Sequence, residues 1–180
     1  MEVHVTELEL FRTCRLSWYY QRREHLVPKG ETPGTPLWIG SGIHHSLAQF
    51  YSRRVHPREA LLTWDEYQGC SIPLMEEILD HYFENFKGDL DVWKVLSVET
   101  PIRVRIPQTR VCLVGTFDLR VLEKGREAWI IDHKTRTYFD SPEGLEANEQ
   151  ITGYLWLAER VGLEARGVIW NEIRKASPRS

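Results

Sequence analysis

The segment Ile130-Ile131-Asp132-His133-Lys134-Thr135 places a carboxylate and an ammonium two residues apart after an apolar run. On a β-strand, side chains two residues apart lie on the same face, so Asp132 and Lys134 would project together. A carboxylate at a strand end can hold a metal ion, and a neighbouring ammonium can stabilise developing negative charge. The alternative is an exposed surface pair without a chemical role.

A second carboxylate, Asp118, lies in the preceding predicted strand, within Val114-Gly115-Thr116-Phe117-Asp118-Leu119. If the residue numbers of hairpin partners sum to 250, with a three-residue loop at Lys124 to Arg126, Asp118 lies directly opposite Asp132. If they sum to 249, the two carboxylates face opposite sides of the sheet. Facing carboxylates repel each other without a cation, and oxygen ligands favour Mg²⁺ or Mn²⁺ over Zn²⁺. The sequence leaves the register open.

Two predicted helices carry further polar candidates. Gln150 and Tyr154 are four residues apart and share a helix face. They are either site residues or a solvated Gln beside a half-buried Tyr. In the other helix, Gly40-Ser41-Gly42-Ile43-His44 places a histidine inside an amphipathic pattern. His44 is either a ligand or a structural histidine of the core.

Periodicity predicts helices in the first half of the chain and strands in most of the second half. Thr6-Glu7-Leu8-Glu9 has capping-box spacing and opens a helix that runs, with a break, to about Arg22. Pro28 to Pro36 is predicted as a loop. The remaining helices are expected at about 39–54, 72–88 and 141–161, and the strands at 102–106, 111–122, 127–134 and 165–170.

This order predicts one α/β domain over residues 1–180, mostly helical over 1–90 and with an α/β core over 95–175. Three antiparallel strands form a meander, and a helix then lets the last strand return to the sheet. With 42% apolar and 27% charged residues, the composition is that of a soluble globular domain. A net charge of −3 means that a bound polyanion must meet a local groove instead of a globally positive surface.

Composition also sets expectations about the cellular setting. No apolar run reaches the roughly 18 residues of a membrane span, and the N-terminus does not have the pattern of a signal peptide. The three cysteines are widely spaced and odd in number, which argues against a disulfide scaffold. We therefore expect an intracellular, cytoplasmic protein that has no membrane partner.

The order of these motifs resembles the RecB-like exonuclease branch of the PD-(D/E)XK nuclease superfamily, to which the CRISPR-associated small exonucleases are related. The chain shows Gly-x-x-x-His, Gly-x-x-Asp, Asp-x-Lys-Thr and Gln-x-x-x-Tyr in that order. Its opening, Phe11-Arg12-Thr13-Cys14-Arg15, is similar to the Phe-x-x-Cys-Pro start of that family, with Arg15 in place of proline. The resemblance implies a restriction-endonuclease-like core with an N-terminal helical part.

The resemblance also implies a role for each matching residue. Asp118 and Asp132 would ligate Mg²⁺ or Mn²⁺ together with the main-chain carbonyl of His133, and His44 would add a ligand. Lys134 would activate the attacking water and offset charge on the phosphate, which makes Asp118, Asp132 and Lys134 the catalytic set. Gln150 and Tyr154 would line the site and contact the nucleic acid. Independently of the resemblance, Arg12 and Arg15 precede the aromatic run Trp18-Tyr19-Tyr20 and are either contacts for single-stranded DNA or a solvated helix face. Glu99 lies on the preceding strand and could reach the site, but Pro101 interrupts that region, so an exposed strand residue is expected there.

The activity implied is metal-dependent hydrolysis of DNA, by an exonuclease that acts on ends or single strands in repair or recombination. Two alternatives stay open: a silent DNA-binding or assembly subunit, and a nuclease domain that works only with a separate helicase. Some relatives bind an iron–sulfur cluster through one N-terminal and three C-terminal cysteines. Cys14 matches the first, but no cysteine follows Cys112, so we expect no cluster and a buried, apolar role for Cys14.

Overall fold

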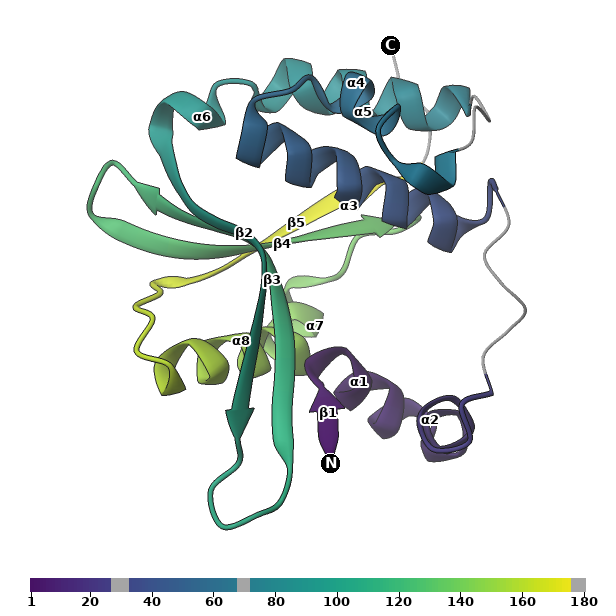
Figure 1. Ribbon diagram of the computed structural model, residues 1–180, viewed down its shortest axis with the longest axis vertical. Coiled ribbons are helices and arrows are strands. Elements are labelled where there is room, and N and C mark those ends of the chain that lie inside the picture. The colour runs from purple at the N-terminus through teal and green to yellow at the C-terminus, as the bar shows by residue number, and fades with distance from the viewer. Residues whose placement is uncertain (27–32, 68–71, 176–180) are drawn as a thin grey trace.

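The computed structural model describes residues 1–26, 33–67 and 72–175, and it contains one mixed sheet with helices on both faces (Figure 1). The predicted loop at 28–36 falls largely outside the described residues. Strands β2 (Trp93–Arg105), β3 (Cys112–Glu123) and β4 (Glu127–Arg136) form the predicted antiparallel meander. Strand β5 (Gly167–Arg174) returns parallel to β4. These elements confirm the predicted fold class.

The turn between β3 and β4 sets the register that the sequence left open. Glu123 pairs with Glu127 across the three-residue loop, and Leu119 pairs with Ile131, so that partner numbers sum to 250. The pairing stops at Leu119 and Ile131, and the two strands separate beyond it. The short strand β1 (Glu2–His4), which the sequence pattern did not reveal, pairs with Cys112–Val114 on the other part of β3. Residues 115–118 of β3 therefore lie in a gap between two neighbouring strands.

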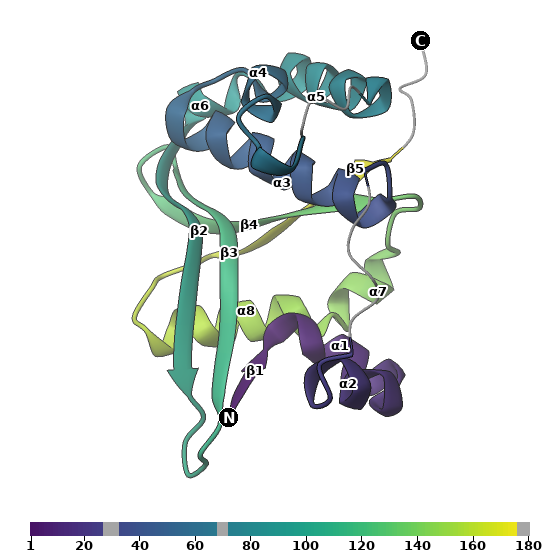
Figure 2. The same cartoon turned by 45° about the vertical axis from the view of Figure 1, so that its right-hand side comes forward.

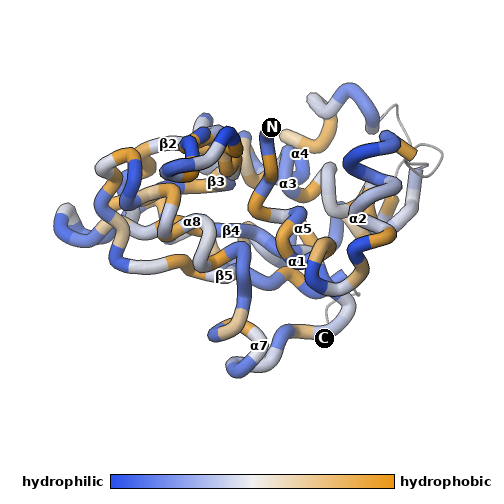
Figure 3. The backbone as a smooth tube through the Cα atoms, turned by 90° about the horizontal axis from the view of Figure 1, so that it is seen from below, coloured by the Kyte–Doolittle hydropathy of each residue, from blue (hydrophilic) through white to orange (hydrophobic). Residues whose placement is uncertain are grey.

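Two helical layers cover the sheet (Figures 1 and 2). One layer contains α3 (Pro36–Arg53), α4 (Pro57–Leu61), the 3₁₀ turn Asp65–Tyr67, α5 (Pro73–Phe86) and α6 (Asp89–Val92). The opposite layer contains α1 (Val5–Thr13), α2 (Arg15–Arg22), α7 (Pro142–Glu146) and α8 (Glu149–Arg160). Figure 3 shows hydrophobic and hydrophilic residues interleaved along the helices, the pattern of elements that are covered on one side.

Each layer closes its own apolar core, and the sheet separates the two. Ile131 packs with Ile43 and Leu79 beneath α3 and α5, whereas its neighbour Ile130 packs with Leu157 of α8 on the other face. Gly40 allows α3 to approach β4 closely, because a Cβ there would lie 3.0 Å from Thr135 Oγ1. The close approach brings the middle of α3 over the point where β3 and β4 separate.

Three local expectations are corrected. The first helix is capped two residues earlier than predicted, since His4 and Glu7, instead of Thr6 and Glu9, form the capping box. The predicted helix at 141–161 is two helices, because the Asn148 side chain caps α8 by accepting hydrogen bonds from Gln150 N and Ile151 N. Cys14 is exposed instead of buried: it lies between α1 and α2, where its Sγ accepts a hydrogen bond from Ser17 N at 3.4 Å. Over the described ranges, no helix has the length and apolar character that a membrane span requires.

Candidate active site

Asp118 and Asp132 lie where β3 and β4 separate. Asp118 Oδ2 accepts a hydrogen bond from the backbone N–H of His133 at 2.8 Å, in the place where a strand partner would otherwise bond. Asp132 is fully buried. A side chain thus replaces the ladder at the opening, and two carboxylates are held in the gap of the sheet.

Lys134 projects on the same side as Asp132, as the alternation of a strand requires. Its Nζ lies 2.5 Å from Asp132 Oδ2. The ammonium also lies 4.8 Å from the centre of the Trp170 ring on the neighbouring strand β5. Because the Lys134 side chain is only 22% exposed, the indole and the carboxylate hold the ammonium in one place.

The other oxygen of Asp132 is held from α8. Gln150 Nε2 donates to Asp132 Oδ1 at 3.0 Å and to the Tyr154 hydroxyl at 2.7 Å. Gln150 is 7% exposed and Tyr154 is 3% exposed. Both side chains thus lie beneath the carboxylate, where they orient it, and their expected contact with DNA stays a prediction.

His44 reaches the same opening from α3. Its Nδ1 lies 3.4 Å from Asp118 Oδ2, and its side chain is 30% exposed. The ring is therefore beside the carboxylates and open to solvent on one side. Of the two alternatives that the sequence left for His44, this position favours a ligand over a histidine of the core.

Sequence reasoning missed Glu99. The pairs Val98↔Leu119 and Thr100↔Phe117 flank Glu99 and Asp118, so the three acids Glu99, Asp118 and Asp132 lie in a row across β2, β3 and β4. Glu99 adopts a left-handed conformation with φ 47°, an uncommon and strained state for a residue with a side chain. Ligand atoms of His44, Glu99 and Asp118 lie within 4.8 Å of one another. No periodicity reports such a backbone state, so the sequence carried no signal for it.

The electrostatics of the row favour a cation. Glu99 is exposed to the groove, but the surrounding protein desolvates its carboxyl and, with the charges of Asp118 and Asp132, raises its pKa to about 7. Desolvation also raises the pKa of Asp118, although the neighbouring His44 opposes the shift. Both shifts mean that negative charge is costly here without a counter-ion. Carboxylate oxygens, an imidazole nitrogen and a main-chain carbonyl are suitable ligands for Mg²⁺ or Mn²⁺, so the residues present fit a divalent ion.

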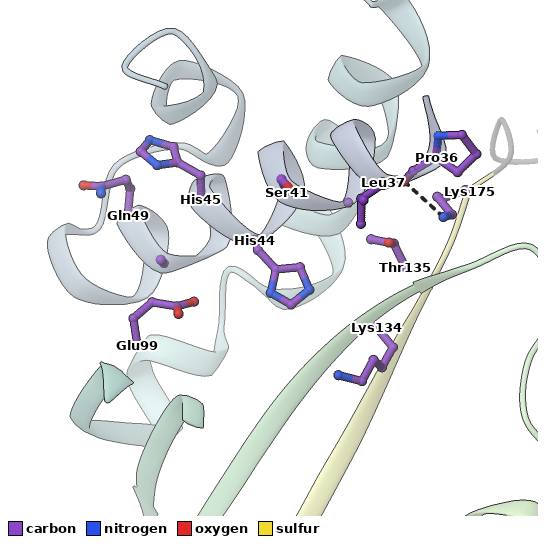
Figure 4. A pocket seen from close by; sticks show the side chains of 12 residues that line it. Pro36, Leu37, Ser41, His44, His45, Gln49, Glu99, Lys134, Thr135 and Lys175 are labelled. Atoms are coloured by element: carbon purple, nitrogen blue, oxygen red, sulfur yellow. Dashed lines mark hydrogen bonds between the residues drawn. The ribbon is translucent and has the colours of Figure 1, made fainter. Parts of the chain in front are cut away.

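A groove of about 860 Å³ opens over this cluster. Figure 4 shows that His44 and Glu99 point into it from α3 and β2, and that Lys134 and Thr135 enter from β4. At one end, Lys175 Nζ donates to the carbonyl of Pro36 at 3.2 Å. His44, Glu99 and Lys134 thus line one open groove.

Arg12 and Arg15, which were expected to contact DNA, lie on α1 and α2. Arg12 pairs with Glu149 at 2.8 Å, and the Arg15 guanidinium lies 5.4 Å from the centre of the Phe11 ring. Neither arginine is among the described residues that line the groove. Their contact with nucleic acid stays a prediction.

Comparisons with known proteins show to which family the chain belongs. The family model of the PD-(D/E)XK nuclease superfamily matches residues 2–178. Among solved structures, that of SSO0001 is 18% identical with a TM-score of 0.41; the match covers 96% of this chain and 62% of that one. The chain therefore spans less than two thirds of that structure, and a search of curated proteins gives no match. With the family model matched over nearly its whole length, the chain belongs to the PD-(D/E)XK nuclease superfamily, whose members are usually metal-dependent nucleases.

Proposed function

We propose that this protein is a divalent-metal-dependent deoxyribonuclease that hydrolyses phosphodiester bonds at DNA ends or in single strands. The observation that carries the proposal is the row of acids Glu99, Asp118 and Asp132 with Lys134 Nζ 2.5 Å from Asp132. A buried structural ion pair would need one carboxylate for one ammonium. An excess of carboxylates in a groove instead supports a site for a cation and a phosphate.

The roles of the residues follow from their positions. When bound, a divalent ion supplies positive charge that polarises a phosphoryl oxygen and lowers the pKa of a water molecule. Asp118, Asp132, His44 and the carbonyl of His133 would hold this ion. Lys134, fixed between Asp132 and Trp170, would face the phosphate and stabilise the negative charge that develops during hydrolysis.

Action on ends or single strands is the finer part of the proposal. It rests on the likeness of the motif order to the RecB-like branch. The open groove beside the carboxylates is compatible with a strand that lies along α3, where Thr135 and Lys175 can meet phosphates on the side of Lys134. A role in repair or recombination, with a helicase as partner, belongs to the same proposal.

The test is a cleavage assay with linear and covalently closed DNA. Single- and double-stranded forms, labelled at either end, are incubated with Mn²⁺ or Mg²⁺ and with a chelator. We expect cleavage of linear substrates with metal and none with chelator. Mononucleotide or short products would indicate an exonuclease, and cleavage of closed circles would replace that part of the proposal with an endonuclease.

The controls separate the alternatives. Lys134→Ala removes the ammonium from the groove, and Lys94→Ala removes an exposed lysine from β2 as a matched change. Only Lys134→Ala should abolish cleavage. DNA binding without metal-dependent cleavage by the wild type would instead support a silent binding subunit. Cleavage that appears only with an added helicase would instead support a nuclease domain that works only with a separate helicase.

A further inference from the structure

His133 lies between Asp132 and Lys134 on β4. A buried chain of hydrogen bonds connects its side chain to the helical layer that contains α3, α5 and α6. Asn171 Nδ2 lies 2.8 Å from His133 Nδ1 and donates to the Tyr82 hydroxyl at 3.1 Å. The Tyr82 and Tyr51 hydroxyls lie 2.8 Å apart, and Tyr51 donates to Asp89 Oδ2 at 2.8 Å. The chain joins β4, β5, α5, α3 and α6.

We propose that Asn171, Tyr82 and Tyr51 are positioning residues that fix the peptide of His133 in the metal site through this chain. The inference rests on the proposed function, since it concerns a backbone group that would hold the ion. None of the three residues lines the groove, so each would act through His133.

The direction of every hydrogen bond in the chain follows from its acidic end. An ionised Asp89 accepts only, so Tyr51 must donate to it and must accept from Tyr82. Tyr82 then accepts from one hydrogen of the Asn171 amide, whose second hydrogen goes to His133 Nδ1. His133 is consequently a neutral imidazole with its proton on Nε2. Asn171 thus donates on both sides, and the two tyrosines donate in turn toward Asp89, which defines a single arrangement.

Burial makes that arrangement costly to break. Tyr51, Tyr82 and His133 are 3%, 4% and 3% exposed. Burial raises the pKa of both tyrosines far above the ordinary value, so their hydroxyls remain donors at any pH of interest. A polar group left without its partner here loses a hydrogen bond that water cannot replace.

The other side of His133 shows why its ring matters. Its backbone N–H donates to Asp118, and its ring packs against Tyr51 with centroids 5.8 Å apart and planes at 15°. The ring and the peptide share one Cα, so a ring held by Asn171 and Tyr51 restricts the orientation of the peptide. Asn171 is the register partner of His133 on β5, which makes the contact a property of the sheet itself.

The experiment measures Mn²⁺ affinity by calorimetry, independently of cleavage. Asn171→Leu keeps the size of the side chain and removes the amide, and we expect its Mn²⁺ affinity to fall about tenfold, as for other groups that orient metal ligands. Tyr82→Phe removes one hydroxyl and should weaken binding by about threefold. The double variant should be little worse than Asn171→Leu, because both changes break one chain.

Tyr67→Phe is the matched control. Tyr67 is 6% exposed in the same core, and its hydroxyl donates to Glu76, away from His133. This variant should lower the melting temperature without changing Mn²⁺ affinity. In the metal-free protein, the ¹⁵N spectrum of His133 should show the proton on Nε2, and Asn171→Leu should disturb this tautomer while Tyr67→Phe should not.

The outcomes distinguish two kinds of failure. A wild-type protein that binds no Mn²⁺ would remove the proposed metal site altogether. A wild type that binds Mn²⁺, together with an Asn171→Leu variant that folds and binds it equally well, would overturn the positioning role alone. If Asn171→Leu does not fold, Tyr82→Phe and Tyr51→Phe decide, and unchanged affinity in both would reject the proposal.

Discussion

Asp118 accepts a hydrogen bond from the backbone N–H of His133 across the opening between β3 and β4. The contact substitutes a carboxylate for a strand partner at the place where the ladder ends. The same hydrogen bond connects Asp118, one expected metal ligand, to His133, whose main-chain carbonyl is another. The separation of two strands, rather than a loop, therefore shapes the site, and rigid elements hold each of its charged groups.

The role of Lys134 predicts two separable effects of Lys134→Ala. Cleavage should fall by at least about 100-fold, because a charge aimed at the developing phosphate charge is lost. The metal-free variant should also melt at a lower temperature, since fully buried Asp132 loses its ion partner. Lys94→Ala should show neither effect. Cleavage by Lys134→Ala at the wild-type rate would remove the lysine from the mechanism.

His44 and His45 offer a matched pair on one helix. His44 faces Asp118, whereas His45 Nε2 lies 3.0 Å from Thr63 Oγ1. His44→Ala should weaken Mn²⁺ binding about tenfold, with a small effect on the metal-free melting temperature. His45→Ala should keep the affinity. Calorimetric titration separates the two, and equal affinities for His44→Ala and wild type would make His44 a structural residue.

The raised pKa of Glu99 predicts that the free energy of unfolding of the metal-free protein depends on pH. Its folded pKa of about 7 lies above the ordinary value of 4.5, so the folded state binds more protons between these values. The stabilisation that the protonated Glu99 carboxyl contributes is fully present below about pH 4.5 and is lost as the pH rises through 7. Glu99→Gln should therefore be more stable than wild type at pH 8, and the difference should shrink towards pH 5.

The measurement is a pair of metal-free melts across that range. The comparison with Glu99→Gln cancels the opposite contribution of His133, whose burial lowers its pKa to about 3 and favours unfolding in acid. A difference that does not change between pH 5 and pH 8 would show that Glu99 is not desolvated by the cluster.

The features of the fold and of the site that could be predicted are those that depend on residues close together in the sequence. The three-residue loop at 124–126 fixes the hairpin register, and that register alone places Asp118 opposite Asp132. Helix existence followed from apolar spacing, but helix ends did not: His4 and Asn148 cap α1 and α8 at points that periodicity does not report. Glu99 was missed because its left-handed backbone and its neighbours on β3 are long-range properties.

The same distinction applies to Gln150 and Tyr154. Their spacing correctly predicted a shared helix face, but the depth of that face depends on how α8 packs against β4. Only the packing shows that the two side chains hold Asp132 from below instead of lining a surface. The chain of hydrogen bonds from Asp89 to His133 had no sequence signal, because five separate elements contribute one residue each.

The carboxylates themselves provide the final prediction, because the structure makes them unequal. Asp118→Asn removes a carboxyl group whose pKa is raised by burial and by the charge of Asp132. The oxygen of the asparagine side chain can still accept the hydrogen bond from the backbone N–H of His133. The metal-free melting temperature should therefore rise slightly. Asp132→Asn instead leaves Lys134 and Gln150 facing an amide, so this variant should melt at a lower temperature.

The metal response should be lost in both variants. An ion that binds only the folded state stabilises wild type by about 2.7 kcal/mol at a hundredfold excess over Kd, which is a rise of roughly 5–10 °C for a chain of this size. Melts at pH 7.5 with and without Mn²⁺ measure this rise in wild type, both single variants and the double variant. The double variant should lose no more of the rise than either single one, since both residues act on one ion. An equal Mn²⁺ shift in all four proteins would mean that Asp118 and Asp132 share no ion, and the proposed nuclease site would lose its central support.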